Sequence, residues 1–477
     1  MKKSFIHPVR HPNLALWLSA VEATVNNNVS HFFHKNNLST DDHHPMVKAT
    51  SDHINDLVNG KIIPEHPLDN FTDPHDPGLL KNISNDFFEL AEAHRENDIS
   101  KIEEIKEKHL KYSKFDIMGW TSSVLTYLEY FDGGILKPHY NDWKIQGQGN
   151  INSGLIEYKL PNDARVAIIS DWGTGTHDAK DMLVRIMDIH KPDAIIHLGD
   201  IYYAGTPAQC KANFLDVFDE IFSTRERVPV FNLPGNHDYY ALGKGFYGLL
   251  EQINPASEPS WQQRTSYFCL RTEDNSWQFL GMDTGIGDYD PKDQISNTYT
   301  GPVLQPSEIE WHRDKLENFN GRTILLSHHQ LFSANNRIGA KRATRPYLNE
   351  HLYEVFSPYF NSIGMWLWGH EHNLAMYQND LFGLAKGRLL GCGSYNAAYE
   401  EDPYKVNYPE VPYLEPMVKL GITSNYYNHG YAILDMKRKQ PSDSLNIKYY
   451  QLPVWMGDKS KYLPDDQEHE LFKEEIN

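Results

Sequence analysis

The sequence predicts an α/β layered domain over residues 165–455, preceded by a mainly helical region over residues 1–145. Two observations predict this division. Beyond residue 165, short apolar runs alternate with amphipathic segments, which is typical of buried central strands joined by helices. Before residue 145, apolar residues recur instead at helical spacing.

In the N-terminal region the apolar spacing predicts helices over 13–26, 85–110 and 112–131. Residues 64–78 are interrupted by Pro and Asp and are expected to form a loop. Gly and Asn cluster in 141–154, so we place a linker at 146–164. The role of this helical region stays open, and a partner-binding or dimerising module is one possibility.

In the α/β region, five apolar runs are expected to be strands: 165–170, 193–199, 228–234, 323–329 and 364–370. The segments between them predict helices around 178–190, 208–222, 306–318 and 347–358. Two further β-rich stretches, 267–284 and 430–452, suggest a second sheet. Residues 456–477 are expected to be a C-terminal tail, and the Tyr- and Pro-rich segment 398–428 a lid, a rim or an ordinary surface insertion.

The charge balance argues against some classes of partner. The chain of 477 residues has 45 Lys and Arg and 64 Asp and Glu, a formal net charge of −19. A chain this acidic is not expected to bind nucleic acid or an anionic membrane surface. A small anionic substrate would need local positive charge, which bound metal ions supply.

The sequence predicts a cellular compartment only through the targeting and membrane signals that it lacks. The three cysteines, Cys210, Cys269 and Cys392, are too few and too far apart to suggest a disulfide framework. The N-terminus has basic residues but no continuous apolar core of a signal peptide, and no later stretch reaches the ~20 apolar residues of a membrane span. We therefore expect a cytoplasmic protein.

The residues that follow the five apolar runs indicate a function. Each run ends in a short motif that contains side chains able to bind metals: Ser170-Asp171, Gly199-Asp200, Gly235-Asn236-His237-Asp238, His328-His329 and Gly369-His370-Glu371-His372. In α/β sheets the carboxyl ends of the strands and the loops beyond them form the ligand crevice. Five separate loops are therefore expected to converge on one site.

The residue types fit a pair of metal ions. Asp, Asn and His offer oxygen and nitrogen ligands for hard or borderline metals, and Asp200 could bridge two cations. Metals ~3.5–4 Å apart polarise a phosphoryl oxygen and generate hydroxide near neutral pH. His237 could protonate the leaving group as a general acid, with Asp238 orienting its ring. The glycine before several of the ligands would permit a sharp turn.

Each motif also has a simpler interpretation. An Asp after a strand is usually a helix cap or a turn residue, and an isolated Gly-Asp or Gly-Asn pair is usually a turn. With 24 histidines in the chain, adjacent pairs also arise by accident. All five motifs in order, each after an apolar run, are difficult to assign to chance and favour a metal site.

This set of motifs resembles the calcineurin-like metallophosphoesterase superfamily, whose usual signature is D-x-H, G-D-x-x-D, G-N-H-D/E, a strand-end His and G-H-x-H. Two departures stand out: Gly173 follows Asp171-Trp172 where the family has His, and Tyr203 replaces the second Asp of G-D-x-x-D. Both changes are typical of the purple acid phosphatases. The resemblance covers residues 165–455 and implies an αββα sandwich, two mixed β-sheets flanked by helices.

The resemblance also implies a ligand set for two metals. One metal, expected to be Fe(III), would bind the side chains of Asp171, Asp200, Tyr203 and His372. The other, Zn, Fe or Mn in the divalent state, would bind those of Asp200, Asn236, His328 and His370. His329 would face the substrate or support the ligands from behind, since His328 takes the family's first position in the strand-end motif.

The expected reaction is hydrolysis of a phosphomonoester by a metal-bound hydroxide. A phosphodiesterase or nucleotide pyrophosphatase with the same metal centre is the alternative. A serine/threonine protein phosphatase fits less well, because the Asp-Arg pair of those enzymes is missing from the segment around Tyr203. A binding module that has lost activity would normally lack ligands, and here every expected position is filled.

Overall fold

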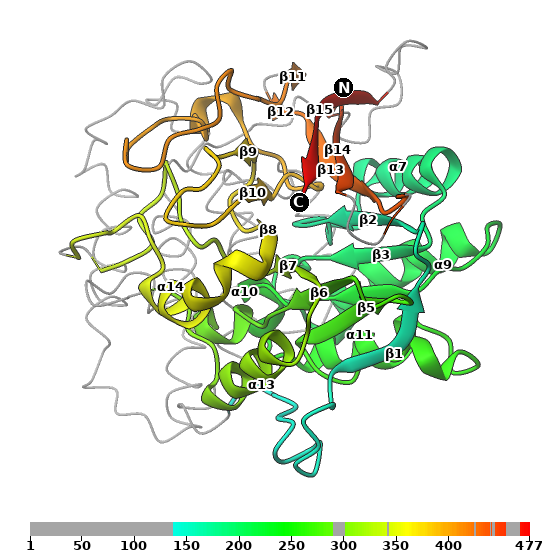
Figure 1. The fold of residues 1–477 in the computed structure, drawn as a ribbon. Helices are drawn as coiled ribbons and strands as arrows, with labels where there is room; N and C mark the ends of the chain where they lie inside the picture. Colours follow the sequence, from blue (N-terminus) through cyan, green and yellow to red (C-terminus); the bar gives the residue numbers. More distant parts are fainter. Residues whose placement is uncertain are drawn as a thin grey trace, which may run out of the picture. The chain divides into compact units, whose positions relative to one another are not determined.

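The computed structural model describes residues 137–289, 301–340, 343–423, 426–438, 440, 444–454 and 468–477 (Figure 1). The helices predicted over 13–26, 85–110 and 112–131 lie outside the described residues. From Pro138 onward the chain forms one compact unit built on two large β-sheets. None of the described helices is long and apolar enough to cross a lipid bilayer.

Both sheets are mixed. The first has the order β15-β14-β13-β2-β3-β4, with β15 (His469–Ile476), β14 (Leu445–Leu452), β13 (His429–Asp435), β2 (Arg165–Ile169), β3 (Ala194–His197) and β4 (Val230–Asn232). The second has the order β1-β5-β6-β7-β8-β10-β9, with β1 (Leu155–Leu160), β5 (Phe268–Thr272), β6 (Trp277–Gly281), β7 (Arg322–Leu326), β8 (Ile363–Trp368), β10 (Gly387–Leu390) and β9 (Leu374–Met376).

All five predicted strands are present, but they are divided between the sheets. Strands β2, β3 and β4 are parallel neighbours in one sheet, and β7 and β8 are parallel neighbours in the other. The pattern suggested that the two β-rich stretches form a second sheet. In the structure they do not form a sheet of their own. Each is an antiparallel pair that extends one parallel group: β13 pairs with β2, and β6 pairs with β7.

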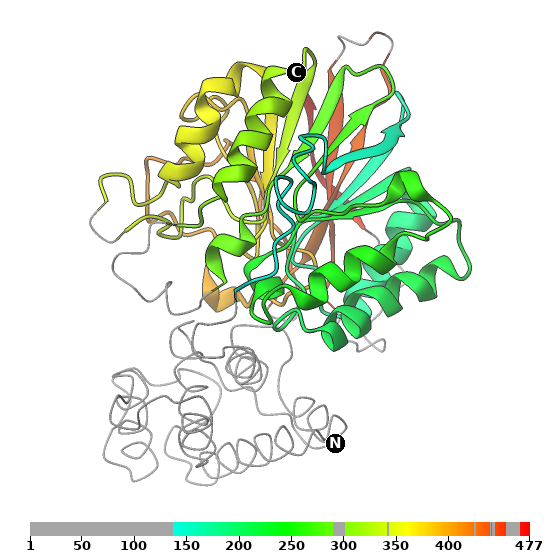
Figure 2. The same ribbon diagram turned by 90° about the horizontal axis from the view of Figure 1, so that it is seen from below.

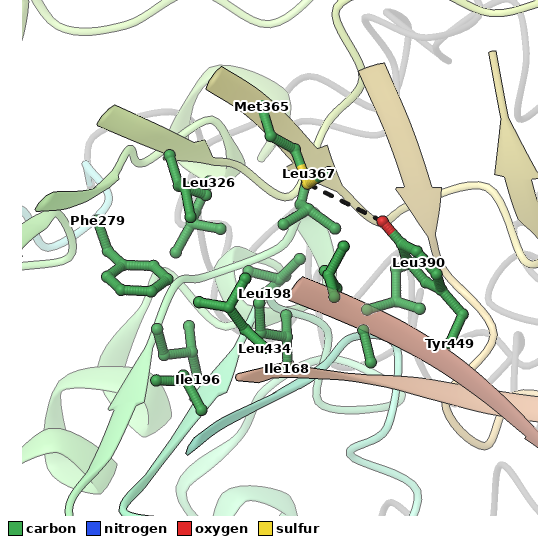
Figure 3. Close-up of a cluster of buried hydrophobic side chains, with 14 of the residues drawn as sticks. Ile168, Ile196, Leu198, Phe279, Leu326, Met365, Leu367, Leu390, Leu434 and Tyr449 are labelled. Atoms are coloured by element: carbon green, nitrogen blue, oxygen red, sulfur yellow. Dashed lines mark hydrogen bonds between the residues drawn. The ribbon is translucent and has the colours of Figure 1, made fainter. Parts of the chain in front are cut away.

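The two sheets pack face to face around the main hydrophobic core (Figure 3). Ile168, Ile196 and Leu434 from the first sheet meet Phe279, Leu326 and Leu367 from the second. All six side chains are fully buried, so alternate residues of the central strands point into this layer.

Helices cover the outer face of each sheet, as Figure 2 shows. Helices α7 (His177–Arg185), α9 (Asp216–Phe222) and α11 (Lys244–Ile253) bury Met182, Phe218 and Leu249 against the first sheet. Helices α13 (Pro306–Glu317) and α14 (Glu350–Phe356) bury Trp311 and Leu352 against the second. The αββα arrangement implied by the motifs is confirmed. Helices α7, α9, α13 and α14 match the predicted segments, whereas α11 was not predicted.

Strands at both ends extend beyond the expected limits of the α/β domain. Strand β1 lies within the predicted linker 146–164 and pairs with β5. Strand β15 lies within the predicted tail 456–477 and pairs with β14 along its whole length. Both are outermost strands, and their sequences carry charged residues that a buried strand would lack.

The Tyr- and Pro-rich segment 398–428 is packed into the fold rather than laid over it. Tyr404 and Leu420 are buried in the core between the sheets, and Val411 is buried in the core beneath α13 and α14. The backbone of Tyr413 pairs with that of Tyr377, just beyond β9. These contacts make the described part of this segment an integral wall of the domain, and the interpretation as a lid is wrong.

Candidate metal centre

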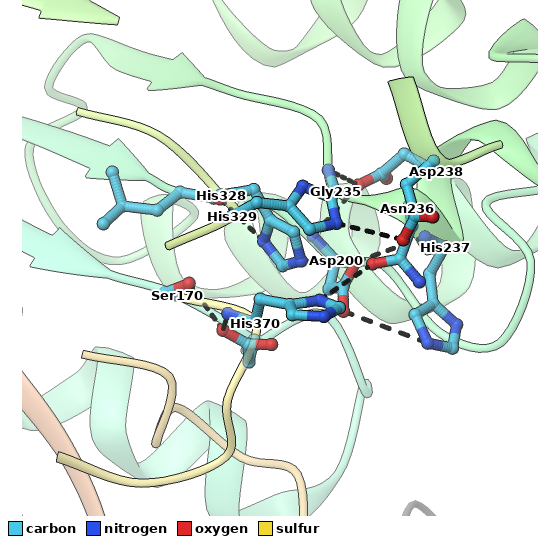
Figure 4. A network of polar contacts seen from close by, with 12 residues as sticks. Ser170, Asp200, Gly235, Asn236, His237, Asp238, His328, His329 and His370 are labelled. Atoms are coloured by element: carbon cyan, nitrogen blue, oxygen red, sulfur yellow. Dashed lines mark hydrogen bonds and ion pairs between the residues drawn. The ribbon is translucent and has the colours of Figure 1, made fainter. Parts of the chain in front are cut away.

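The carboxyl ends of five strands from the two sheets meet at one place (Figure 4). Asp171 follows β2, Asp200 follows β3, and Asn236 begins α10 (Asn236–Tyr239) after β4. His328 follows β7, and His370 and His372 follow β8. The structure thus brings together the residues that the sequence separated by two hundred positions.

The first group of candidate ligands contains Asp171, Asp200 and His372, whose ligand atoms all lie within 4.8 Å of one another. The Nε2 atom of His372 is 3.5 Å from Oδ1 of Asp171. Oδ2 of Asp171 accepts hydrogen bonds from the Ser170 hydroxyl (2.6 Å) and from the backbone N–H of His370 (3.1 Å). The Asp171 carboxylate is therefore held in place by its neighbour Ser170 and by the loop after β8, which carries His370 and His372.

The second group contains His328, His329 and His370, which also approach within 4.8 Å of one another. Oδ1 of Asn236 lies 3.2 Å from Nδ1 of His370. Oδ1 of Asp200 lies 3.3 Å from Nε2 of His328. Asp200 therefore faces both groups, as the predicted bridging ligand would.

The tyrosine that points into the first group is Tyr202. Its hydroxyl lies 3.2 Å from Oδ1 of Asp171 and 3.1 Å from Nε2 of His372. Tyr203, the ligand expected from the motif, contributes its backbone carbonyl oxygen, which lies 2.5 Å from Nδ1 of His237. Burial and the Asp171 carboxylate raise the pKa of Tyr202 well above its usual value, so a phenolate here would need a cation beside it.

His237 lies beside Asp200, and its Nε2 atom is 3.9 Å from Oδ2 of the Asp200 carboxylate. Because a carbonyl oxygen only accepts hydrogen bonds, the contact with Tyr203 assigns the ring proton to Nδ1. Burial lowers the pKa of His237 to about 4, although Asp200 raises it.

Asp238 was expected to orient the His237 ring, but the Tyr203 carbonyl occupies that position. The Asp238 carboxylate instead accepts hydrogen bonds from the backbone N–H groups of Gly235 (2.7 Å) and Asp200 (3.0 Å). It therefore fixes the two loops that carry Asp200 and Asn236 relative to each other. Burial and the neighbouring Asp200 carboxylate raise the pKa of Asp238 to about 8.

Both ring nitrogens of His329 are occupied. Nδ1 lies 3.0 Å from the hydroxyl of Thr284, and Nε2 lies 3.2 Å from Oδ2 of Asp288. These contacts support the choice of His328 as the ligand and of His329 as a residue that supports it, and this choice stays a prediction. Thr284 and Asp288 were missed, since nothing in the sequence around them distinguishes them from loop residues.

Close packing explains why glycine precedes or follows several ligands. A Cβ atom at Gly235 would lie 2.0 Å from Oδ1 of Asp200, and one at Gly369 would lie 1.9 Å from the Ser170 hydroxyl oxygen. At Gly173, where the family has histidine, a Cβ atom would lie 2.7 Å from the backbone of Ile201. Only Gly199 needs glycine for its backbone conformation as well, with φ at +110°.

Several ligands have unusual backbone angles. Asp171, Asp200 and His370 have positive φ values of 53°, 74° and 69°. Non-glycine residues rarely adopt this region, and such residues often occur at functional sites.

The chemistry of these residues fits bound cations. Asp171 and Asp200 are fully buried, and none of the Lys or Arg ion pairs among the described residues involves either of them. Buried carboxylates need a compensating positive charge. Burial raises the pKa of Asp200, but His328, His237 and His370 outweigh this and lower it well below its usual value, which keeps the carboxylate ionised.

His328 also fits metal ligation. Burial lowers its pKa, but Asp200, Asp171 and Asp238 together raise it to about 9, so a bound metal would take the place of a proton on its ring. Its Nδ1 atom lies 3.0 Å from the carbonyl oxygen of Leu198, while Nε2 faces Oδ1 of Asp200 at 3.3 Å. A metal-binding histidine commonly donates its other ring N–H to a carbonyl in this way.

Comparison with known proteins agrees with this arrangement. The family model of calcineurin-like phosphoesterases matches residues 164–374. An uncharacterised protein of Acanthamoeba polyphaga mimivirus is 24% identical over 225 residues, which cover 41% of this chain and 79% of the viral protein.

Solved structures with low similarity include a purple acid phosphatase from yellow lupin seeds, which is 14% identical with a TM-score of 0.38. That match covers 66% of this chain and 54% of the lupin chain. A dimetal phosphatase from Danio rerio is also 14% identical with a TM-score of 0.38, over 60% of this chain and 95% of that chain.

The family match spans β2 to β9, and every candidate ligand lies within it. Residues 164–374 are therefore similar to the calcineurin-like phosphoesterases, and the candidate metal centre lies in this matched part of the chain.

Proposed function

We propose that the protein hydrolyses a phosphomonoester at a dinuclear metal centre of the purple acid phosphatase kind. The observation that carries this proposal is the position of Asp200 between the two groups of ligands. A carboxylate in that position can give one oxygen to each of two cations. Asp171, His372 and a tyrosine would complete the first metal site, and Asn236, His328 and His370 the second.

The residues of the chain divide the work between them. Two bound cations would polarise the phosphoryl oxygens and lower the pKa of water. Asp171 and Asp200 supply the negative charge that holds both cations in a buried place. His237, which contacts Asp200 but is not needed as a ligand, would donate the Nε2 proton of its protonated ring to the leaving group.

We propose Fe(III) for the first site, because a tyrosine oxygen is a hard anionic donor once it is ionised. Zn, Fe or Mn in the divalent state would fill the second site, whose ligands are imidazole nitrogens, an amide oxygen and a carboxylate. Elemental analysis of the purified protein identifies both metals. A metal content near zero after expression in metal-supplemented medium would contradict the proposed centre.

The substrate class is tested with p-nitrophenyl phosphate and its bis ester. We expect faster turnover of the monoester, together with loss of both turnover and bound metal in Asp200→Ala. Faster turnover of the bis ester would favour the phosphodiesterase or nucleotide pyrophosphatase alternative. Two bound metals without turnover of either ester would favour a binding module.

We further propose that the substrate is a small phosphate ester, that the protein binds neither nucleic acid nor membranes, and that it acts in the cytoplasm. The net charge of −19 supports the first two points, since polyanions would be repelled. The partner of residues 1–145 is unknown.

A further inference from the structure

The side chain of Asn236 is held from both sides. Its Oδ1 atom lies 3.2 Å from Nδ1 of His370, within the second group of candidate ligands. Its Nδ2 atom donates a 2.7 Å hydrogen bond to the hydroxyl oxygen of Tyr240. Tyr240 follows Asn236 by four residues, at the end of the short helix α10, so one helical turn brings the two side chains together.

The orientation of this amide decides whether it binds a metal. Only the oxygen of an asparagine side chain is a ligand, because the NH₂ group has no free lone pair to offer. When the oxygen faces a cation, the NH₂ group must point away from it. Asn236 is only 3% exposed, so water does not solvate that NH₂ group and it needs an acceptor from the protein.

We propose that Tyr240 is a positioning residue for the second metal ion, and that its hydroxyl holds the Asn236 amide with Oδ1 facing the cation. This inference rests on the proposed dinuclear centre. Tyr240 is itself buried, and its ring lies 4.9 Å from that of His237, so packing fixes the hydroxyl where Nδ2 needs it. Residues that hydrogen-bond to a metal ligand and orient it commonly contribute about 10–100-fold to metal affinity.

A neighbouring tyrosine provides a matched control. Tyr239 lies on the same helix, and its hydroxyl donates a 2.5 Å hydrogen bond to Oδ2 of Asp283. Both tyrosines are buried and both bury a hydroxyl group. Tyr239→Phe therefore removes a comparable buried hydrogen bond from the same helix, but one that is directed away from Asn236.

The test is titration of Mn²⁺ into metal-free full-length protein, followed by calorimetry and by electron paramagnetic resonance. We expect two bound ions in the unmodified protein. Tyr240→Phe should weaken one of the two sites about 10–100-fold and leave the other unchanged. Tyr239→Phe should leave both dissociation constants unchanged, even if its midpoint of thermal unfolding falls.

A double-variant comparison checks that Tyr240 acts through Asn236. In the Asn236→Ala background, Tyr240→Phe should cause no further loss of Mn²⁺ affinity. Equal affinities of Tyr240→Phe and the unmodified protein, or a loss that persists in the Asn236→Ala background, would overturn the inference. Absence of Mn²⁺ binding by the unmodified protein would instead contradict the proposed dinuclear centre.

Discussion

Gly235 and Asp200 approach so closely that a Cβ atom at position 235 would lie 2.0 Å from Oδ1 of Asp200. The backbone N–H groups of both residues donate to the same carboxylate, that of Asp238. The loops after β3 and β4 are thus joined at a point where no side chain fits between them. This contact places the candidate bridging ligand beside Asn236.

We expect Gly235→Ala to displace the Asp200 carboxylate, since neither the backbone nor the buried ligand has room to move. Bound metal and turnover should both be lost, and the free energy of unfolding should fall by about 1–3 kcal/mol through overpacking. Metal analysis and urea unfolding measure these effects. Gly248→Ala is the control: it lies in α11 and its Cβ atom would have no neighbour within 4 Å, so stability should rise by about 0.5–1 kcal/mol. Full metal content in Gly235→Ala would show that the contact is not critical.

A second prediction separates two adjacent tyrosines. If Tyr202 is the phenolate ligand to Fe(III), as the position of its hydroxyl suggests, Tyr202→Phe should abolish the visible charge-transfer band of the iron-loaded protein. Tyr203→Phe should then keep the band, because the contact of Tyr203 with His237 uses a backbone oxygen. Absorption spectra of the two variants decide the matter. Loss of the band only in Tyr203→Phe would restore the assignment made from the motif.

These two residues show what the sequence could and could not provide. The positions of Asp171, Asp200 and His328 were predictable because each follows an apolar strand, and strand ends meet at one edge of the fold. The choice between Tyr202 and Tyr203 was not, because they are chemically identical neighbours and only the fold decides which hydroxyl reaches Asp171 and His372. The motif alone favours Tyr203.

Longer-range support was beyond the sequence as well. Thr284 and Asp288 contact His329 from more than forty positions away, through a loop that has no motif of its own. Strands β1 and β15 escaped prediction because edge strands are partly exposed and need no continuous apolar run. Pairing with a neighbouring strand, which sequence spacing does not encode, stabilises them.

A third prediction concerns His237. Its ring contacts Asp200 and Tyr203 but lies outside both groups of candidate ligands, so His237→Ala should keep both metals. Loss of a general acid should lower kcat ~10²–10⁴-fold for an ester with a poor leaving group such as an alkyl phosphate. The loss should be smaller for p-nitrophenyl phosphate, whose leaving group needs less protonation. Steady-state kinetics with both esters test this, and equal losses would argue against proton donation.

The last prediction follows from a buried acidic pair away from the metal ligands. Glu308 accepts hydrogen bonds from the backbone N–H of Asp283 (2.8 Å) and from the Tyr140 hydroxyl (3.0 Å). Burial raises the pKa of Glu308 to about 8. Burial, together with the Glu308 charge, raises the pKa of Asp283 to about 7. Both groups bind protons more tightly in the folded chain than in the unfolded chain, where ordinary carboxyl pKa values near ~4 apply.

The contribution of this pair to the free energy of unfolding should therefore be greatest below about pH 4. It should fall as the pH rises from there to about 8. Each group contributes at most about 1.4 kcal/mol per pH unit. Urea titrations measure the decline in the free energy of unfolding between pH 5.5 and pH 8. Glu308→Gln should make this decline less steep, because glutamine cannot ionise. Glu310→Gln is the matched control, because Glu310 lies on the same helix, 55% exposed beside Lys144, and should leave the slope unchanged. Parallel pH curves for Glu308→Gln and the unmodified protein would mean that the pair stays ionised in the folded state.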